Sequence, residues 1–163
     1  MLRRRCSVAA FVTMIGGLVL SGCTSIDCPL NNTVRAVWSL DGATLTDSLT
    51  VSTARNEGND TVLINRQTGV MTFQLPVSYG HDEDVFFFER SGNSGFHTVD
   101  TVTIGKEDLP HFESVDCNPT FFHTLTSATT TQHGIDSVVV SEKNVNFDTS
   151  HAHLKIYFKS RLQ

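Results

Sequence analysis

Residues 152–159 read Ala-His-Leu-Lys-Ile-Tyr-Phe-Lys, and small or apolar side chains alternate with polar or amphipathic ones along the whole stretch. A period of two predicts a β-strand with one face on a core and the other in water. The side chains expected to face the core are Ala152, Leu154, Ile156 and Phe158, and those expected to face water are His153, Lys155, Tyr157 and Lys159. Because this strand comes last in the chain, it must join a sheet built from earlier strands, and its loss should unfold the domain.

The same period continues backwards to Thr33, where runs of β-branched and aromatic residues alternate with turn-forming clusters. No helical periodicity is present in this region. We expect strands near residues 34–40, 49–53, 61–65, 71–75, 85–89, 97–104, 112–117, 120–126, 135–141 and 152–158. Nine or ten short strands predict an all-β fold, either an antiparallel β-sandwich of the Ig-like kind or a distorted barrel.

Two positions refine this prediction. Phe86, Phe87 and Phe88 place aromatic rings on both faces of one strand, which indicates a central strand or one covered on both sides. Pro76 has no backbone donor, so it indicates a strand end or a sheet edge.

The amino-terminal segment has the pattern of a bacterial lipoprotein signal. Three arginines (residues 3–5) precede an apolar run (residues 8–20), and the run ends in Leu20-Ser21-Gly22-Cys23, which resembles a lipobox. A transmembrane anchor is the alternative, but a spanning helix needs about 20 apolar residues. We therefore expect a helical signal peptide at 1–22, a tether at 23–32 that starts with acylated Cys23, and a β-sandwich domain at 33–163.

The charge of the mature chain follows from this cleavage. Of 12 Lys and Arg residues three are lost with the signal, which leaves nine against 17 Asp and Glu, a formal net charge of −8. This balance argues against binding nucleic acid, or an anionic membrane, through a basic patch. The membrane partner is then expected only through the lipid on Cys23.

Cysteine usage agrees with export. Cys6 is lost with the signal and Cys23 is acylated, so Cys28 and Cys117 remain. In an oxidising compartment two cysteines can form one disulfide. Two separate buried thiols or a metal-binding pair are the alternatives.

Short motifs along the chain are similar to those of one group of proteins. They are the lipobox, Cys28-Pro29, the segment Phe-Glu-Ser-Val-Asp-Cys at 112–117 and the segment His-Leu-Lys-Ile-Tyr-Phe at 153–158. The chain thereby resembles small outer-membrane lipoproteins of Bacteroidales-type bacteria that form a family of unknown function. The resemblance implies a Cys28–Cys117 disulfide and brings no catalytic residues.

Histidines and carboxylates offer the main candidates for chemistry. His81 precedes Asp82, Glu83 and Asp84, but the calcium-loop spacing is missing, so a solvated acidic loop is expected. His151 and His153 lie two residues apart and could chelate a metal with a third ligand that the sequence does not identify. We expect no metal site and no cofactor here.

Four Asp-Ser/Thr-aliphatic triplets resemble the O-glycosylation sequon of Bacteroidota exported proteins. Their acceptor residues are Ser48, Thr61, Thr101 and Ser137. The alternative is structural, because Asp before β-formers often begins a strand.

These features predict an envelope lipoprotein that is not an enzyme: a binding or structural module for a protein or glycan partner. An adhesin or fimbrial subunit is the alternative, and a hydrolase or metal protein would need His81, His151 and His153 to converge. The uncharged residues 24–26 favour the periplasmic face of the outer membrane over the cell surface.

Overall fold

The computed structural model describes residues 28, 33–42, 44–54 and 61–160; the predicted signal peptide, Cys23 and most of the tether lie outside these residues. The described chain forms strands, with one short 3-10 helix, η1 (Asn93–Gly95). The strands are β1 (Arg35–Leu40), β2 (Ser48–Thr53), β3 (Thr61–Gln67), β4 (Thr72–Pro76), β5 (Glu83–Ser91), β6 (His97–His111), β7 (Thr120–Thr130), β8 (Ile135–Val140), β9 (Asn144–Val145) and β10 (Leu154–Phe158). No helix in these ranges is long and apolar enough to cross a membrane.

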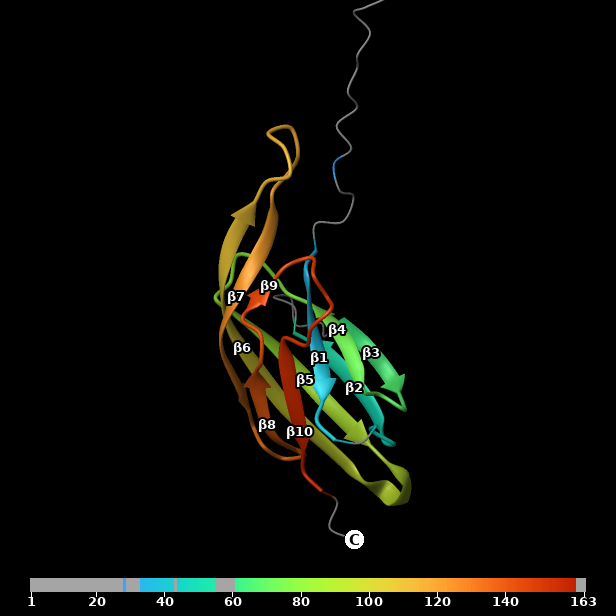
Figure 1. Ribbon diagram of the computed structural model, residues 1–163. Coiled ribbons are helices and arrows are strands. Elements are labelled where there is room, and N and C mark those ends of the chain that lie inside the picture. Colours follow the sequence, from blue (N-terminus) through green and yellow to red (C-terminus); the bar gives the residue numbers. More distant parts are fainter. Residues whose placement is uncertain (1–27, 29–32, 43, 55–60, 161–163) are drawn as a thin grey trace, which may run out of the picture.

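Two sheets pack face to face, which confirms the all-β sandwich (Figure 1). The six-stranded sheet has the order β3-β2-β5-β6-β7-β9, and the four-stranded sheet has the order β4-β1-β10-β8. The predicted antiparallel β-sandwich is confirmed, with one pair of strands as the exception. β1 and β10 run parallel, with Trp38 opposite Leu154.

The core lies between the sheets and is centred on Trp38. Its indole ring packs against Phe73, Phe86 and Phe88, with ring centroids 6.0, 5.9 and 5.5 Å away. β5 lies inside the larger sheet between β2 and β6, and its third ring, Phe87, is half-buried. This arrangement confirms β5 as a central strand, and Pro76 ends β4 at the edge of the smaller sheet, as predicted.

The β6–β7 hairpin differs from the prediction. A separate strand was expected at 112–117, but β6 continues from His97 to His111 and pairs with β7 over its whole second half. The register shifts between Gly105 and Lys106, so the strand bends there and runs on instead of ending. A Cβ on Gly105 would lie 2.4 Å from Ser127 Oγ and 2.8 Å from Thr126 Oγ1, so a larger residue at this position would require these two side chains to move.

Arg90 fastens β5 to the carboxyl-terminal strand. Its Nε donates to Asp47 Oδ2 at 2.7 Å, and its Nη1 donates to the carbonyl of Lys159 at 3.3 Å. The guanidinium lies over the rings of Phe96 and Phe158, at 5.1 and 5.2 Å from their centroids. Burial lowers the pKa of Arg90, and the ion pair with Asp47 together with the two aromatic rings compensates the buried charge.

Candidate functional site

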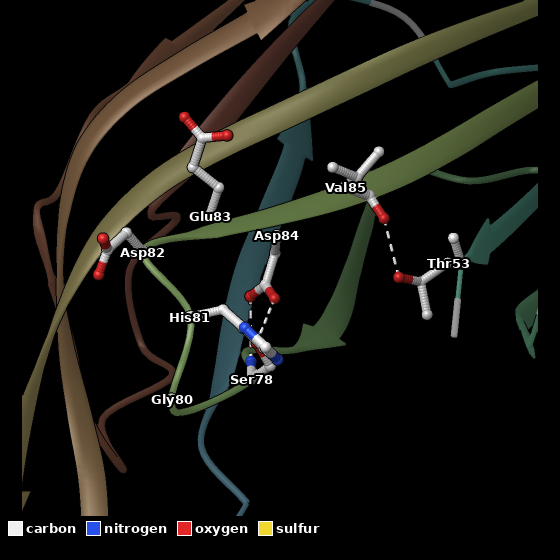
Figure 2. A pocket seen from close by; sticks show the side chains of 9 residues that line it. Thr53, Ser78, Gly80, His81, Asp82, Glu83, Asp84 and Val85 are labelled. Carbon is white, nitrogen blue, oxygen red and sulfur yellow. Dashed lines mark hydrogen bonds between the residues drawn. The ribbon is translucent and has the colours of Figure 1, made fainter. Parts of the chain in front are cut away.

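An open groove of about 970 Å³ lies beside the turn that joins β4 to β5 (Figure 2). Its wall is made by the end of β2, the turn and the start of β5. The lining residues are Thr53, Ala54, Ser78, Gly80, His81, Asp82, Glu83, Asp84 and Val85. A smaller hollow of about 340 Å³ adjoins it and shares Thr53, Ser78, His81 and Asp84 with it.

Hydrogen bonds hold the turn at both ends. Asp84 Oδ2 accepts from the Ser78 amide at 3.0 Å, and its Oδ1 accepts from the Ser78 hydroxyl (Figure 2). Asp108 Oδ2 accepts from the Gly80 amide at 2.7 Å, and Lys106 Nζ donates to the His81 carbonyl at 2.5 Å. The turn is therefore fixed to β6 before any ligand arrives, which reduces the entropy cost of binding.

A cluster of charged and polar side chains on β6 and β7 supports the turn. Lys106 Nζ and His123 Nδ1 both lie 2.8 Å from Asp108 Oδ1, and the Lys106 side chain has no exposed surface. Lys106, Asp108 and His123 do not line the groove. We name these three residues the clamp, because they hold the turn and leave its outer side chains available.

Two pKa shifts describe the charge state of the clamp. Burial alone would raise the pKa of Asp108, but the hydrogen bonds from Lys106, Gly80 and His123 outweigh it, so the pKa lies below its ordinary value. Burial lowers the pKa of His123 by more than Asp108 raises it. At neutral pH Asp108 is therefore ionised and His123 is a neutral imidazole whose Nδ1–H donates to the Asp108 carboxylate.

The outer side chains of the turn are available for a ligand. His81, Asp82 and Glu83 are exposed, and their side chains form no hydrogen bond or ion pair with any other described residue. In Figure 2, Asp82 and Glu83 point away from the Asp84–Ser78 pair. Tyr79, 68% exposed, lines the smaller hollow and stacks on Phe121 with centroids 4.9 Å apart and planes 7° apart.

The predicted histidine candidates lie in different environments. His81 lines the groove, and His151 is exposed in the bend before β10. His153 was expected on a wet strand face, but it precedes β10 and is buried, with Nδ1 accepting from the Val37 amide at 3.0 Å. In the described ranges no three His, Cys, Asp or Glu residues are arranged to hold a metal ion.

The expectation for His153 was wrong because the alternation starts only at Leu154. Residues before it bend so that the His153 amide donates to the Val37 carbonyl at 2.8 Å, and the ring turns inward to the Val37 amide. Burial lowers the pKa of His153, although a hydrogen bond with the Asn144 backbone raises it. The residue is a neutral structural bridge between the bend and β1.

Acidification should weaken the fold through these two histidines. The folded pKa values of His123 and His153 lie below the ordinary value of about 6.5, so the unfolded state takes up protons first. Their stabilisation is complete above pH 6.5 and declines as the pH falls below it; Asp108, whose pKa is also lowered, adds a loss below about pH 4. In thermal melts from pH 8 to 5, His153→Gln should flatten the profile and His151→Gln should not. Identical profiles for both variants would contradict this assignment.

Cys28 and Cys117 form a disulfide, with sulfurs 2.04 Å and Cα atoms 5.5 Å apart. The expected proximity of this pair is confirmed. The bond joins the amino-terminal end of the described chain to the loop between β6 and β7.

The four sequon hydroxyls are all half-buried. Ser48 and Thr61 begin β2 and β3, whereas Thr101 and Ser137 lie within β6 and β8. Their modification stays a prediction, for mass spectrometry of the native protein to test.

Sequence reasoning missed the clamp and Tyr79. The one signal was Lys106-Glu107-Asp108, a charged run that interrupts a strand of threonines and aliphatic residues. This run does not identify the groups that Lys106 and Asp108 contact, because those groups come from the β4–β5 turn and from β7.

Comparison with known proteins identifies a family. A family model described as a family of unknown function, DUF6452, matches residues 48–158, which run from the start of β2 to the end of β10. Searches of curated proteins and of solved structures each give no significant match.

Proposed function

Since the chain belongs to the DUF6452 family, whose description assigns no activity, we propose a function from its own residues. The protein is a lipid-anchored lipoprotein of the cell envelope, held on the periplasmic face of the outer membrane, and it binds a glycan without transforming it. The glycan is neutral or carries amino sugars. The observation that carries this proposal is the turn at residues 78–84, fixed by the clamp and presenting free polar groups beside an exposed aromatic ring.

The anchor is supported by the lipobox that ends in Cys23 and by the likeness to Bacteroidales-type lipoproteins. The disulfide between Cys28 and Cys117 is a second support, because such bonds persist in exported proteins and are rare in the cytosol.

The glycan is supported by the chemistry of the groove and of the smaller hollow that adjoins it. One face of the Tyr79 ring is covered by Phe121, and the rest of its exposed surface suits the apolar C–H face of a sugar ring. Asp82 and Glu83 can accept hydrogen bonds from sugar hydroxyls, and His81 can donate or accept one. The same carboxylates repel uronic acids and phosphorylated sugars, which is why we propose a neutral or amino-sugar ligand.

The groove can be tested with purified protein and envelope glycans, namely peptidoglycan fragments and neutral oligosaccharides. Tyr79→Ala should weaken binding at least about tenfold, which corresponds to about 1.4 kcal/mol, because the stacking surface is lost. Tyr79→Phe should keep most of the affinity. Val139→Ala is the matched control, since Val139 is exposed on β8 and does not line the groove.

Three outcomes would contradict the proposal. Equal glycan binding by Tyr79→Ala and the native protein would remove the groove with its adjoining hollow as the site. A photo-crosslinker at Tyr79 that captures a protein in native membranes would favour a protein partner, or an adhesin if the captured protein is a second copy. Release of sugar that is lost in Asp82→Asn or Glu83→Gln would indicate a glycosidase, since a pair of carboxylates also serves glycoside hydrolysis.

A further inference from the structure

The loop between β6 and β7 extends beyond the rest of the sandwich (Figure 1). It carries two strongly exposed apolar side chains, Phe112 at 60% and Val115 at 97%. The Cys117 amide donates to the Ser114 carbonyl at 3.2 Å, so Val115 lies in a closed turn. We name residues 112–117 the hairpin tip.

The disulfide joins the hairpin tip to Cys28, a residue close in sequence to the proposed acylation site Cys23. Cys117 belongs to the tip, and Cys28 follows Cys23 by five residues, which span at most about 17 Å when fully extended. If Cys23 carries acyl chains, the bilayer surface therefore lies within reach of the tip. Because the tether is short, contact between the tip and the bilayer is nearly intramolecular, and a weak apolar interaction is then enough to keep the tip at the bilayer surface.

We propose that Phe112 and Val115 dip into the headgroup region of the bilayer that holds the anchor. The contact rests on the proposed acylation of Cys23, and it adds a second, protein-made attachment to the lipid one. The apolar tip favours this surface because burying its side chains removes apolar area from water.

The charges of the tip determine which lipid surface it fits. Glu113 lies two residues before Val115 and Asp116 directly after it, and residues 107–120 contain no Lys or Arg. Glu113 pairs with His111 at 3.2 Å, whereas the carboxylate of Asp116 is exposed. The carboxylates must stay in water, so the insertion is shallow, and a zwitterionic surface binds the tip better than an anionic one.

The contact would also orient the groove. Lys106 and Asp108, which hold the β4–β5 turn, lie on β6, the strand that leads into the tip. Six residues of extended chain separate Lys106 from Phe112, and at strand spacing they span about 20 Å. The glycan groove would then stand roughly that distance above the lipid headgroups.

The test uses full-length protein purified with its lipid and placed in phosphatidylcholine vesicles with brominated acyl chains. Phe112→Trp and Val115→Trp should each lose at least half of the added tryptophan fluorescence, because bromine quenches only at close range. Val139→Trp, on an exposed position of β8, should not be quenched, and Trp38 is fully buried and gives the same background in every variant. Replacing a third of the lipid with phosphatidylglycerol should reduce the quenching.

The outcomes separate this inference from the anchor. Intact mass shows first whether Cys23 is acylated, and an unmodified mass overturns the anchor itself. Acylated, vesicle-bound protein with unquenched tryptophans at 112 and 115 overturns the tip contact alone. Equal quenching at 139 or stronger quenching with phosphatidylglycerol also overturns it. Because Val115 is almost fully exposed, Val115→Trp keeps the test valid if Phe112→Trp folds poorly.

Discussion

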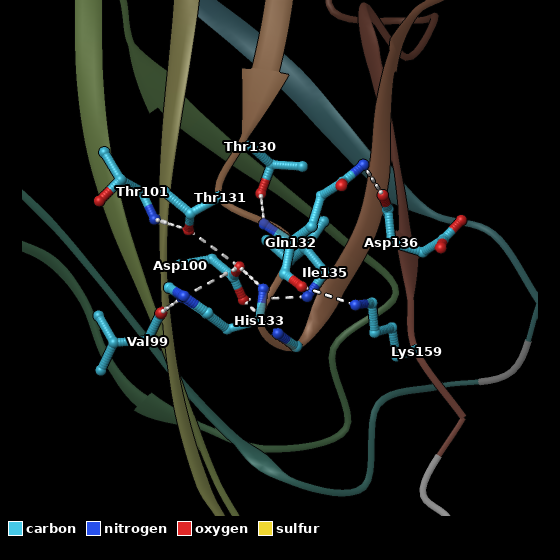
Figure 3. A network of polar contacts seen from close by, with 11 residues as sticks. Val99, Asp100, Thr101, Thr130, Thr131, Gln132, His133, Ile135, Asp136 and Lys159 are labelled. Carbon is cyan, nitrogen blue, oxygen red and sulfur yellow. Dashed lines mark hydrogen bonds and ion pairs between the residues drawn. The ribbon is translucent and has the colours of Figure 1, made fainter.

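Replacing Asp100 with alanine should lower the free energy of unfolding by about 4 kcal/mol. The residue does not line the groove, so the effect is on stability and not on ligand binding. Asp100 is 1% exposed, and its carboxylate closes the turn between β7 and β8 (Figure 3). It accepts from the amides of His133, Gly134 and Ile135 at 2.6, 2.7 and 2.9 Å, and from Thr131 Oγ1 at 3.1 Å.

The size of the effect follows from what alanine would leave behind. Three consecutive backbone donors would lose their charged acceptor, and each buried donor without a partner costs about 1–3 kcal/mol. The backbone of the turn cannot easily move to bring these amides to another acceptor, because the turn is packed closely on β6. A Cβ on Gly134 would lie 2.3 Å from Thr98 Oγ1. We therefore expect no compensating shift of the backbone.

Urea unfolding of the purified domain measures this effect. Asp136→Ala is the control, because Asp136 is exposed on β8 and its side chain forms no hydrogen bond or ion pair with another described residue. That variant should stay within about 0.5 kcal/mol of the native protein. A loss below about 1 kcal/mol for Asp100→Ala would mean that water replaces the carboxylate and that the turn is not held as described.

The strands were predictable because alternation is a local property. Phe86 to Phe88 identified a central strand and Pro76 a sheet edge, and both follow from the geometry of one strand alone. The Cys28–Cys117 pair was also predictable, since only two cysteines remain once Cys6 and Cys23 are assigned to the signal and the lipid.

Features that depend on a partner far along the chain were not predictable. The parallel seam of β1 and β10 joins Trp38 to Leu154, and no local pattern encodes that pairing. The same holds for the clamp, since Asp108 meets His123 only through the register of β6 with β7. His153 was misplaced because a bend, and not the strand, determines where its ring lies.

A chain that stops after His153 should not fold, which is the largest effect we expect. The missing strand, β10, lies inside the smaller sheet between β1 and β8, so its loss removes two ladders of backbone hydrogen bonds. It also removes Leu154 and Ile156, which are fully buried. The remaining β1 and β8 would have no common neighbour, and Trp38 would be exposed to water at the seam.

Circular dichroism and thermal melts distinguish the outcomes, with a chain that stops after Ser160 as the control. That control keeps β10 and the Lys159 carbonyl that Arg90 binds, so it should unfold cooperatively near the native temperature. Ile156→Ala should cost about 3 kcal/mol, whereas Lys155→Ala, on the exposed face, should change stability by less than about 0.5 kcal/mol. A cooperative melt of the chain ending at His153 would show that β1 pairs directly with β8, and that β10 is an addition to the sandwich instead of its closing strand.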